Sequence, residues 1–131
     1  MIGFECSCKK GCHKAPVDNY IIESGAIKKL SSIVKNYSSV FIVCDKNTYN
    51  AAGKYAEETL KNEGKLSGIL ILSEKPLPNY ETIGNILVHV TDTSADSDIF
   101  NYSPLPDLIL AVGSGTINDS CRLVSYRLGI P

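Results

Sequence analysis

Four short apolar runs, separated by stretches with helical spacing, constrain the fold of this chain more than any other feature. Val40-Phe41-Ile42-Val43 is a continuous apolar run, as expected of a strand that is covered on both faces. Strands that alternate with helices of roughly 12 to 14 residues form βαβ units around a parallel sheet. The sequence therefore predicts an α/β domain with strands at Tyr20–Ile22, Ser39–Cys44, Gly68–Leu72 and Leu108–Val112.

Helices are expected between and after these strands. The first begins at Ser24-Gly25 and carries Ile27, Leu30, Ile33 and Val34 on one side. The second runs roughly from Tyr49 to Asn62, is capped by Asn47 or Thr48, is ended by Gly64, and has an inner stripe of Ala52, Tyr55, Ala56 and Leu60. The third, with Ile83, Ile86, Leu87 and Val90, includes residues 87–89, and the fourth spans Thr116–Leu128 with Gly129 as its stop. Residues 92–106 are expected to form a loop.

Residues 1–16 are polar and predict an irregular or hairpin-like N-terminal segment, so the domain itself would span residues 17–131. The formal net charge is -1, which indicates neither nucleic acid nor an anionic membrane as a partner. No run approaches the roughly 18 to 20 apolar residues of a membrane span, and no signal-peptide pattern is present. We therefore expect a cytoplasmic protein.

The five cysteines are an odd number, which argues against a disulfide framework. Cys44 and Cys121 lie in apolar periodic segments and are expected in the core. The other three, Cys6, Cys8 and Cys12, stand beside His13, and together these four are chemically suitable zinc ligands. Adjacent Cys12 and His13 would be awkward on one ion, so reduced thiols are favoured over a metal site. His89 is expected to face solvent.

A glycine-rich turn, Gly113-Ser114-Gly115-Thr116, follows the last predicted strand. Ligands of open parallel sheets bind beyond the carboxyl ends of the strands. Glycines there let backbone amides approach a phosphate, and the following helix adds unpaired N–H groups and its dipole. The hydroxyls of Ser114 and Thr116 can donate further hydrogen bonds to the phosphate, and Thr116 would also cap that helix. The alternative is a turn that uses glycine for its geometry alone, since neither the dinucleotide nor the P-loop fingerprint is complete.

Asp45 directly follows the second predicted strand, at the same edge. A carboxylate there can accept the ribose hydroxyls of an adenosine and would repel a 2′-phosphate, which favours NAD over NADP. The alternative is an Asp that caps a helix or a turn.

The sequence Gly-Ser-Gly-Thr-Ile-Asn-Asp-Ser-Cys-Arg at 113–122, with Gly129-Ile130-Pro131 beyond it, resembles the glycine-rich segment of the iron-alcohol-dehydrogenase and dehydroquinate-synthase-like superfamily. It is most similar to the sn-glycerol-1-phosphate dehydrogenase branch. The Cys-x-Cys segment near a His and the helix start at Ser24-Gly25-Ala26 also look like bacterial members of that branch. The resemblance covers almost the whole chain and only the N-terminal third or so of the family's enzymes. It implies a three-layer, Rossmann-like domain, the N-terminal half of a dehydroquinate-synthase-like fold.

The resemblance also implies roles for individual residues. Gly113, Ser114 and Gly115 would bind the cofactor pyrophosphate, and Asp119 would lie near the nicotinamide carboxamide. The alternative for Asp119 is an acid that complements the helix dipole. The acid that matches Asp45 contacts the adenosine ribose in this superfamily, and the glycerol-1-phosphate branch accepts both NAD and NADP.

The superfamily enzymes hold a divalent metal (Zn, Ni or Fe) with one Asp and two His of a helical C-terminal domain. The sequence contains no plausible ligand set of that kind, so the expected function is the cofactor-binding part of a dehydrogenase. The parent enzyme would reduce dihydroxyacetone phosphate with NAD(P)H and require the missing C-terminal domain, and it could form a homodimer. This chain alone would be inactive.

Three alternatives stay open. A related metal-dependent glycerol or alcohol dehydrogenase would differ mainly in the absent domain. A dehydroquinate-synthase-type lyase usually shows Glu-x-x-Lys after the third strand, and the corresponding residues Glu81–Gly84 lack the lysine. The third is a non-enzymatic nucleotide-binding module or a flavodoxin-like receiver module. A receiver needs several acids at the strand ends, and Asp45 has no acidic neighbours to complete such a cluster.

Overall fold

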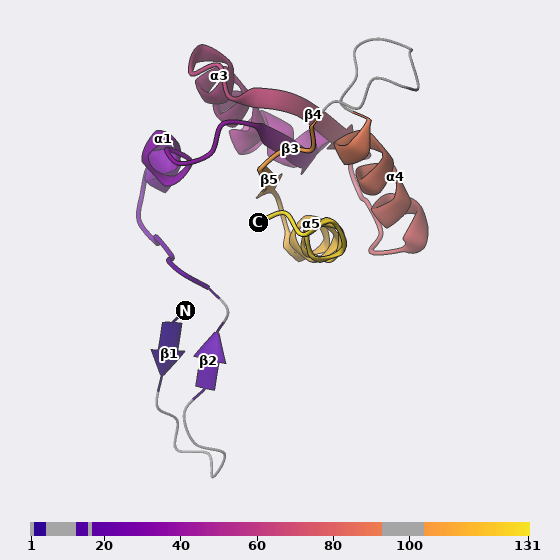
Figure 1. The fold of residues 1–131 in the computed structure, drawn as a ribbon, viewed down its shortest axis with the longest axis horizontal. Coiled ribbons are helices and arrows are strands. Elements are labelled where there is room, and N and C mark those ends of the chain that lie inside the picture. The colour runs from indigo at the N-terminus through magenta and orange to yellow at the C-terminus, as the bar shows by residue number, and fades with distance from the viewer. Residues whose placement is uncertain (1, 5–12, 16, 93–103) are drawn as a thin grey trace.

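The computed structural model describes residues 2–4, 13–15, 17–92 and 104–131. Cys6, Cys8 and Cys12 lie outside these residues, as does most of the loop predicted at 92–106. Two short N-terminal strands, β1 (Ile2–Phe4) and β2 (His13–Ala15), pair with each other in antiparallel orientation. They belong to a separate two-stranded sheet and lie apart from the rest of the domain (Figure 1).

The main sheet has three parallel strands in the order β4-β3-β5, as the sequence predicts for βαβ units. The central strand β3 (Val40–Asp45) is buried at all six positions, which explains its continuous apolar run. Its neighbours are β4 (Leu66–Leu72) and β5 (Leu108–Val112). Asp107, just before β5, accepts hydrogen bonds from the backbone N–H groups of Ser38 (2.8 Å) and Ser39 (2.9 Å), which aligns the starts of β5 and β3.

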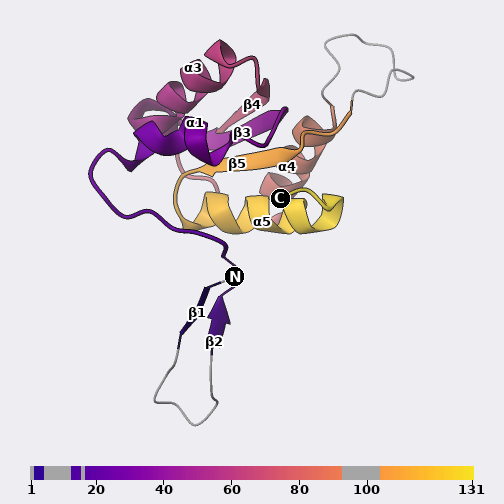
Figure 2. The ribbon, with the colours of Figure 1, turned by 60° about the vertical axis from the view of Figure 1, so that its left-hand side comes forward.

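Helices cover both faces of this sheet and produce three layers (Figure 2). On one face, α1 (Leu30–Ile33) and α3 (Lys54–Asn62) pack against alternate residues of β3. On the other face, α4 (Tyr80–Thr91) and α5 (Gly115–Leu128) pack against the remaining residues. The predicted three-layer α/β fold is confirmed. Among the described residues, no helix is long and apolar enough to cross a membrane.

The core is divided by the sheet into two clusters. One contains Phe41 and Val43 of β3 with Ile86 and Val90 of α4 and Ile117 of α5. The other contains the alternate β3 residues with side chains of α1 and α3, namely Leu30, Val34, Val40, Ile42, Cys44, Ala56 and Leu60. This alternation follows from the two-residue period of a strand.

Both cysteines predicted in the core are there. Cys44 is fully buried and Cys121 nearly so. Burial raises the pKa of the Cys44 thiol to about 11, with a smaller contribution from the negative charge of Asp45, and raises the pKa of Cys121 to about 12. His89 is exposed, as expected, and its Nδ1 lies 2.8 Å from the backbone oxygen of Asn85.

The predicted strand at Tyr20–Ile22 is wrong. Residues 20–22 form neither helix nor strand, and the side chains of Tyr20 and Ile22 are 67% and 89% exposed. A strand needs a partner for its backbone N–H and C=O groups, and none of the described strands pairs with this segment. Three apolar residues were too short a signal to establish such a pairing.

The helix predicted from Ser24 is shorter than its pattern indicates. The segment Ala26–Lys29 forms a 3-10 turn, and α1 adds only one α-helical turn. Leu30 is buried, as is Val34 just after α1, whereas Ile27 and Ile33 are exposed. Two serines and the β-branched Ile33 have low helix propensity, so little besides the Leu30–Val34 contact stabilises a longer helix.

The second predicted helix is divided into three parts: α2 (Lys46–Thr48), a π-helical segment at Tyr49–Gly53, and α3. Its N-cap is Asp45, so the predicted cap at Asn47 or Thr48 is wrong. Helix α3 ends at Asn62, with Gly64 at φ 66°, as predicted. Tyr55 was expected on the inner stripe and is instead exposed.

Strand β4 lies at an edge of the three-stranded sheet, and Ile71 is 42% exposed. The strand predicted at Gly68–Leu72 is confirmed within β4, and its position at the edge leaves Ile71 exposed. The helical interpretation of residues 87–89 is confirmed, because they lie within α4. Helix α5 ends as predicted at Gly129, which has φ 68° and suits a residue without Cβ.

Candidate functional site

The carboxyl edge of the sheet brings together the candidate residues that the sequence places far apart. In the parallel register, Cys44 lies opposite Val112 and Asp45 lies opposite Leu72. Because neighbouring strands are about 4.8 Å apart, Asp45 stands between the turn at Gly113, after β5, and the loop after β4. This is the edge at which open parallel sheets bind their ligands.

The two glycines of the turn have different surroundings. A Cβ at Gly113 would lie 2.7 Å from Cγ1 and 3.0 Å from Cβ of the buried Ile117, so glycine is needed there for close packing of α5 on β5. A Cβ at Gly115 would meet nothing within 4 Å. Neither residue has a positive φ. Packing therefore accounts for Gly113, whereas among the described residues neither backbone conformation nor packing requires glycine at Gly115.

Helix α5 begins directly at this turn. Its N-cap is Ser114, in extended conformation, so the prediction of Thr116 as the cap is wrong: Thr116 already lies inside the helix, one residue after Gly115. The Ser114 side chain makes no capping hydrogen bond. By contrast, Asn79 caps α4 with its side chain. The first N–H groups of α5 therefore lack a capping side chain, and the helix dipole gives this end a partial positive charge.

Asp45 is buried, with 5% of its surface exposed; it is the last residue of β3 and the N-cap of α2. Its Oδ1 accepts the backbone N–H groups of Asn47 and Thr48, each at 2.9 Å. The Thr48 hydroxyl in turn accepts the backbone N–H of Asp45 at 3.0 Å, which completes a capping box. The capping alternative is thus present in the structure. It engages Oδ1, and within the described part of the chain no hydrogen bond reaches Oδ2.

The loop after β4 forms a further part of this edge. The Asn47 side chain donates a hydrogen bond of 3.3 Å to the backbone oxygen of Glu74, which joins the start of α2 to that loop. Beside it lies an open pocket of about 330 Å³, lined by Leu72, Ser73, Lys75, Pro76, Leu77, Asn79, Glu81, Thr82 and Asn85. The sequence prediction had missed this pocket, because no motif marks the loop.

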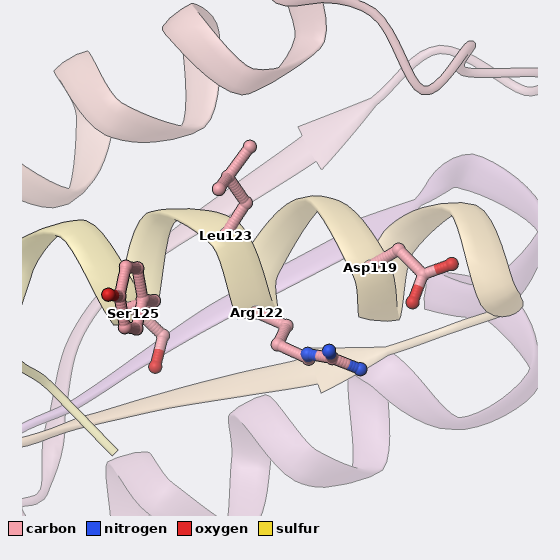
Figure 3. Close-up of a pocket in the computed structure, with 5 residues that line it drawn as sticks. Asp119, Arg122, Leu123 and Ser125 are labelled. Atoms are coloured by element: carbon pink, nitrogen blue, oxygen red, sulfur yellow. The ribbon is translucent and has the colours of Figure 1, made fainter.

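Asp119 lies one turn into α5 and is exposed. It borders a second open pocket, of about 540 Å³, whose described lining residues all belong to α5: Asp119, Arg122, Leu123, Ser125 and Tyr126 (Figure 3). Figure 3 shows the side chains of Asp119 and Arg122 on the same side of the helix. The structure thus extends the candidate site from the glycine turn along α5.

The model of one protein family, described as iron-containing alcohol dehydrogenase, matches residues 21–131. The chain belongs to the iron-containing alcohol dehydrogenase family. It is 28% identical over 127 residues to a glycerol-1-phosphate dehydrogenase [NAD(P)+] of Bacillus velezensis, which covers 94% of this chain and 30% of the relative. A Bacillus subtilis protein of the same name is 29% identical over 117 residues, or 88% of this chain and 28% of the relative.

A solved iron-containing alcohol dehydrogenase from Thermococcus thioreducens has the same fold, with a TM-score of 0.58 and 23% identity. The alignment covers 79% of this chain and 24% of that structure. This iron-containing alcohol dehydrogenase family chain thus spans about 30% of the length of its curated relatives. Among the described residues, no three His, Cys, Asp or Glu side chains come together in a way that could hold a metal ion.

Proposed function

We propose that this chain is the cofactor-binding part of an NAD(P)-dependent glycerol-1-phosphate dehydrogenase. In this proposal the turn Gly113–Thr116 binds the cofactor pyrophosphate. The observation that carries it is the open start of α5: a Cβ at Gly115 would meet nothing within 4 Å, and no side chain caps the helix at Ser114. Backbone N–H groups at an uncapped helix N-terminus suit a phosphate. The names of the curated relatives support a dinucleotide as the ligand.

The rest of the dinucleotide would cross the strand ends. Asp45 is next to the turn, and its Oδ2 is suited to accept a ribose hydroxyl while Oδ1 caps α2. The pocket after β4 is the next neighbour along the edge and would take the adenine. This order follows from the strand order β5-β3-β4. The carboxylate of Asp45 disfavours a 2′-phosphate, so we expect tighter binding of NAD than of NADP.

On the other side of the turn, along α5, Asp119 would accept a hydrogen bond from the nicotinamide carboxamide. When bound, the nicotinamide supplies the hydride. This chain would hold that ring in place through Asp119, and the described residues contribute no cluster that could hold a metal ion. The metal site, and most of the contacts to the phosphorylated triose substrate, would belong to the remaining two thirds of the relatives' length. We therefore propose that residues 17–131 act with such a C-terminal domain, in a cytoplasmic enzyme that forms a homodimer, and that they are inactive alone.

Calorimetric titration with NAD⁺ tests the binding site. We expect Gly115→Val to weaken binding at least about tenfold, because the side chain would fill the space over the α5 amides, and a tenfold loss corresponds to about 1.4 kcal/mol. Gly84→Val in α4 is a matched control, since a Cβ there also meets nothing within 4 Å. It should leave the affinity within about twofold. Equal affinities for wild type and Gly115→Val, with both folded by circular dichroism, would contradict the proposal.

A further inference from the structure

One polar stripe runs along α5 from the glycine turn. Gly115, Asp119, Arg122 and Tyr126 are spaced at i, i+4, i+7 and i+11, so they share one face of the helix. All four are exposed. The buried residues Ile117, Cys121 and Val124 occupy the other side and pack on the sheet. The stripe therefore begins at the glycine turn and continues along the exposed face of α5.

Arg122 carries a charge that the described structure does not neutralise. An acid and a base three residues apart on a helix commonly pair. Here no ion pair joins Asp119 and Arg122, and the ion pairs of the described residues are those of Lys29, Lys61 and Lys65 with glutamates. The pocket thus presents a carboxylate near the start of α5 and, about one turn further along the helix, a guanidinium on the same side (Figure 3).

The remaining polar groups of the pocket narrow the choice of ligand. The Ser125 hydroxyl donates its proton to the backbone oxygen of Ile130, so it offers no donor to a ligand. The donors are the five guanidinium N–H groups of Arg122 and the phenol of the exposed Tyr126. A planar array of donors on a fixed positive charge matches a phosphoryl group, which it can hold through two parallel hydrogen bonds.

We propose that the α5 pocket binds a phosphoryl group through Arg122, with Tyr126 as a second donor. This inference rests on the proposed function in one respect: the phosphoryl group is assigned to the substrate of that dehydrogenase. Arg122 is seven residues beyond Gly115, which is about 10.5 Å along a helix, and the cofactor pyrophosphate is placed at the turn. A second phosphoryl group, as in a triose phosphate held next to the nicotinamide, fits the part of the pocket between Arg122 and Tyr126. The carboxylate of Asp119 separates the two anionic positions.

The test is a nuclear magnetic resonance titration of the full 131-residue chain that follows the Nε–Hε signal of Arg122. Four probes are added separately: dihydroxyacetone phosphate with NAD⁺ present, dihydroxyacetone under the same conditions, NAD⁺ alone, and inorganic phosphate alone. We expect a saturable shift of the Arg122 signal with the phosphate ester and none with dihydroxyacetone. Arg122→Gln should weaken binding of the ester by about 10- to 100-fold, the effect of losing a charge-assisted hydrogen-bonding pair. Arg127→Gln, an exposed arginine of the same helix, should change it by less than about twofold.

The arms of this titration separate the possible sources of the phosphoryl group. If NAD⁺ alone shifts the Arg122 signal and Arg122→Gln weakens NAD⁺ binding, the phosphoryl group is that of the cofactor, and the assignment to the substrate is overturned. If no probe shifts the signal while NAD⁺ binding still depends on Gly115, the Arg122 site is wrong and the proposed function stands. If NAD⁺ does not bind but inorganic phosphate and the ester both shift the signal, the Arg122 site stands and the proposed function fails.

Discussion

The Gly113→Ala substitution tests the assignment of different roles to the two glycines of the turn. The added Cβ would lie 2.7 Å from Cγ1, 3.0 Å from Cβ and 3.4 Å from Cγ2 of Ile117. Carbon atoms pack at about 3.5–4.0 Å, so α5 or the Ile117 side chain must move by roughly 1 Å. Ile117 is fully buried between α5 and the sheet, which leaves it little room to move.

Overpacking of this kind in a core costs about 1–3 kcal/mol. For a domain of this size we expect the melting temperature to fall by about 4–12 °C. Gly115→Ala is the internal comparison: its Cβ meets nothing within 4 Å, and alanine is the better helix former, so its melting temperature should be unchanged or slightly raised. Differential scanning calorimetry of both variants measures the difference. Equal melting temperatures for Gly113→Ala and Gly115→Ala would refute the assignment.

Two further predictions concern buried polar groups. Asp45→Ala should lower the free energy of unfolding by about 0.5–2 kcal/mol, because the α2 cap is lost. Asp45→Ser retains a capping oxygen, so it should lower the free energy of unfolding by less and still weaken NAD⁺ binding. Urea denaturation measures the stability and calorimetric titration the affinity; an Asp45→Ser variant with full NAD⁺ affinity would exclude the ribose role. Because burial raises the pKa of Cys44 to about 11 and of Cys121 to about 12, both thiols stay protonated in the folded state while unfolded thiols ionise near pH 8.5. The free energy of unfolding should therefore decrease as the pH rises above about 8.5. Peptide mapping after iodoacetamide treatment at pH 8 should find Cys44 and Cys121 unlabelled in the folded chain and labelled in denaturant. Labelling of the folded chain at the rate of the unfolded chain would contradict this.

The elements that the sequence predicts well are those whose pattern carries its own physical reason. The run at Val40–Val43 could only be a strand covered on both faces, and β3 is that strand. The end of α5 at Gly129 could be predicted because a glycine after an apolar stripe can adopt the left-handed conformation that ends a helix. The meeting of Asp45 with the turn at Gly113 follows from parallel strands alone, because their carboxyl ends share one edge.

The errors arose where tertiary contacts decide the outcome. Tyr20–Ile22 has strand-like residues and no partner strand among those described. An Asp that ends a strand is compatible with capping a helix and with binding a ribose, and only the hydrogen bonds to Asn47 and Thr48 show that it caps. Nor could the sequence distinguish Gly113 from Gly115, since that difference depends on how closely Ile117 approaches β5.

Arg122 is a different case, because the sequence contained the signal. Its seven-residue spacing from Gly115 and three-residue spacing from Asp119 already place it on one helix face with both. What the sequence could not show is that the arginine and the acid leave each other unpaired and border a pocket of about 540 Å³.

The most direct test of the central claim is to locate NAD⁺ on the chain. Backbone amide signals of the ¹⁵N-labelled protein are recorded before and after addition of NAD⁺. The proposed function predicts that the largest shifts occur at Gly113, Ser114, Gly115 and Thr116, with further shifts at Asp45 and in the loop after β4. Shifts confined to other parts of the chain, or no shifts at millimolar NAD⁺, would contradict it.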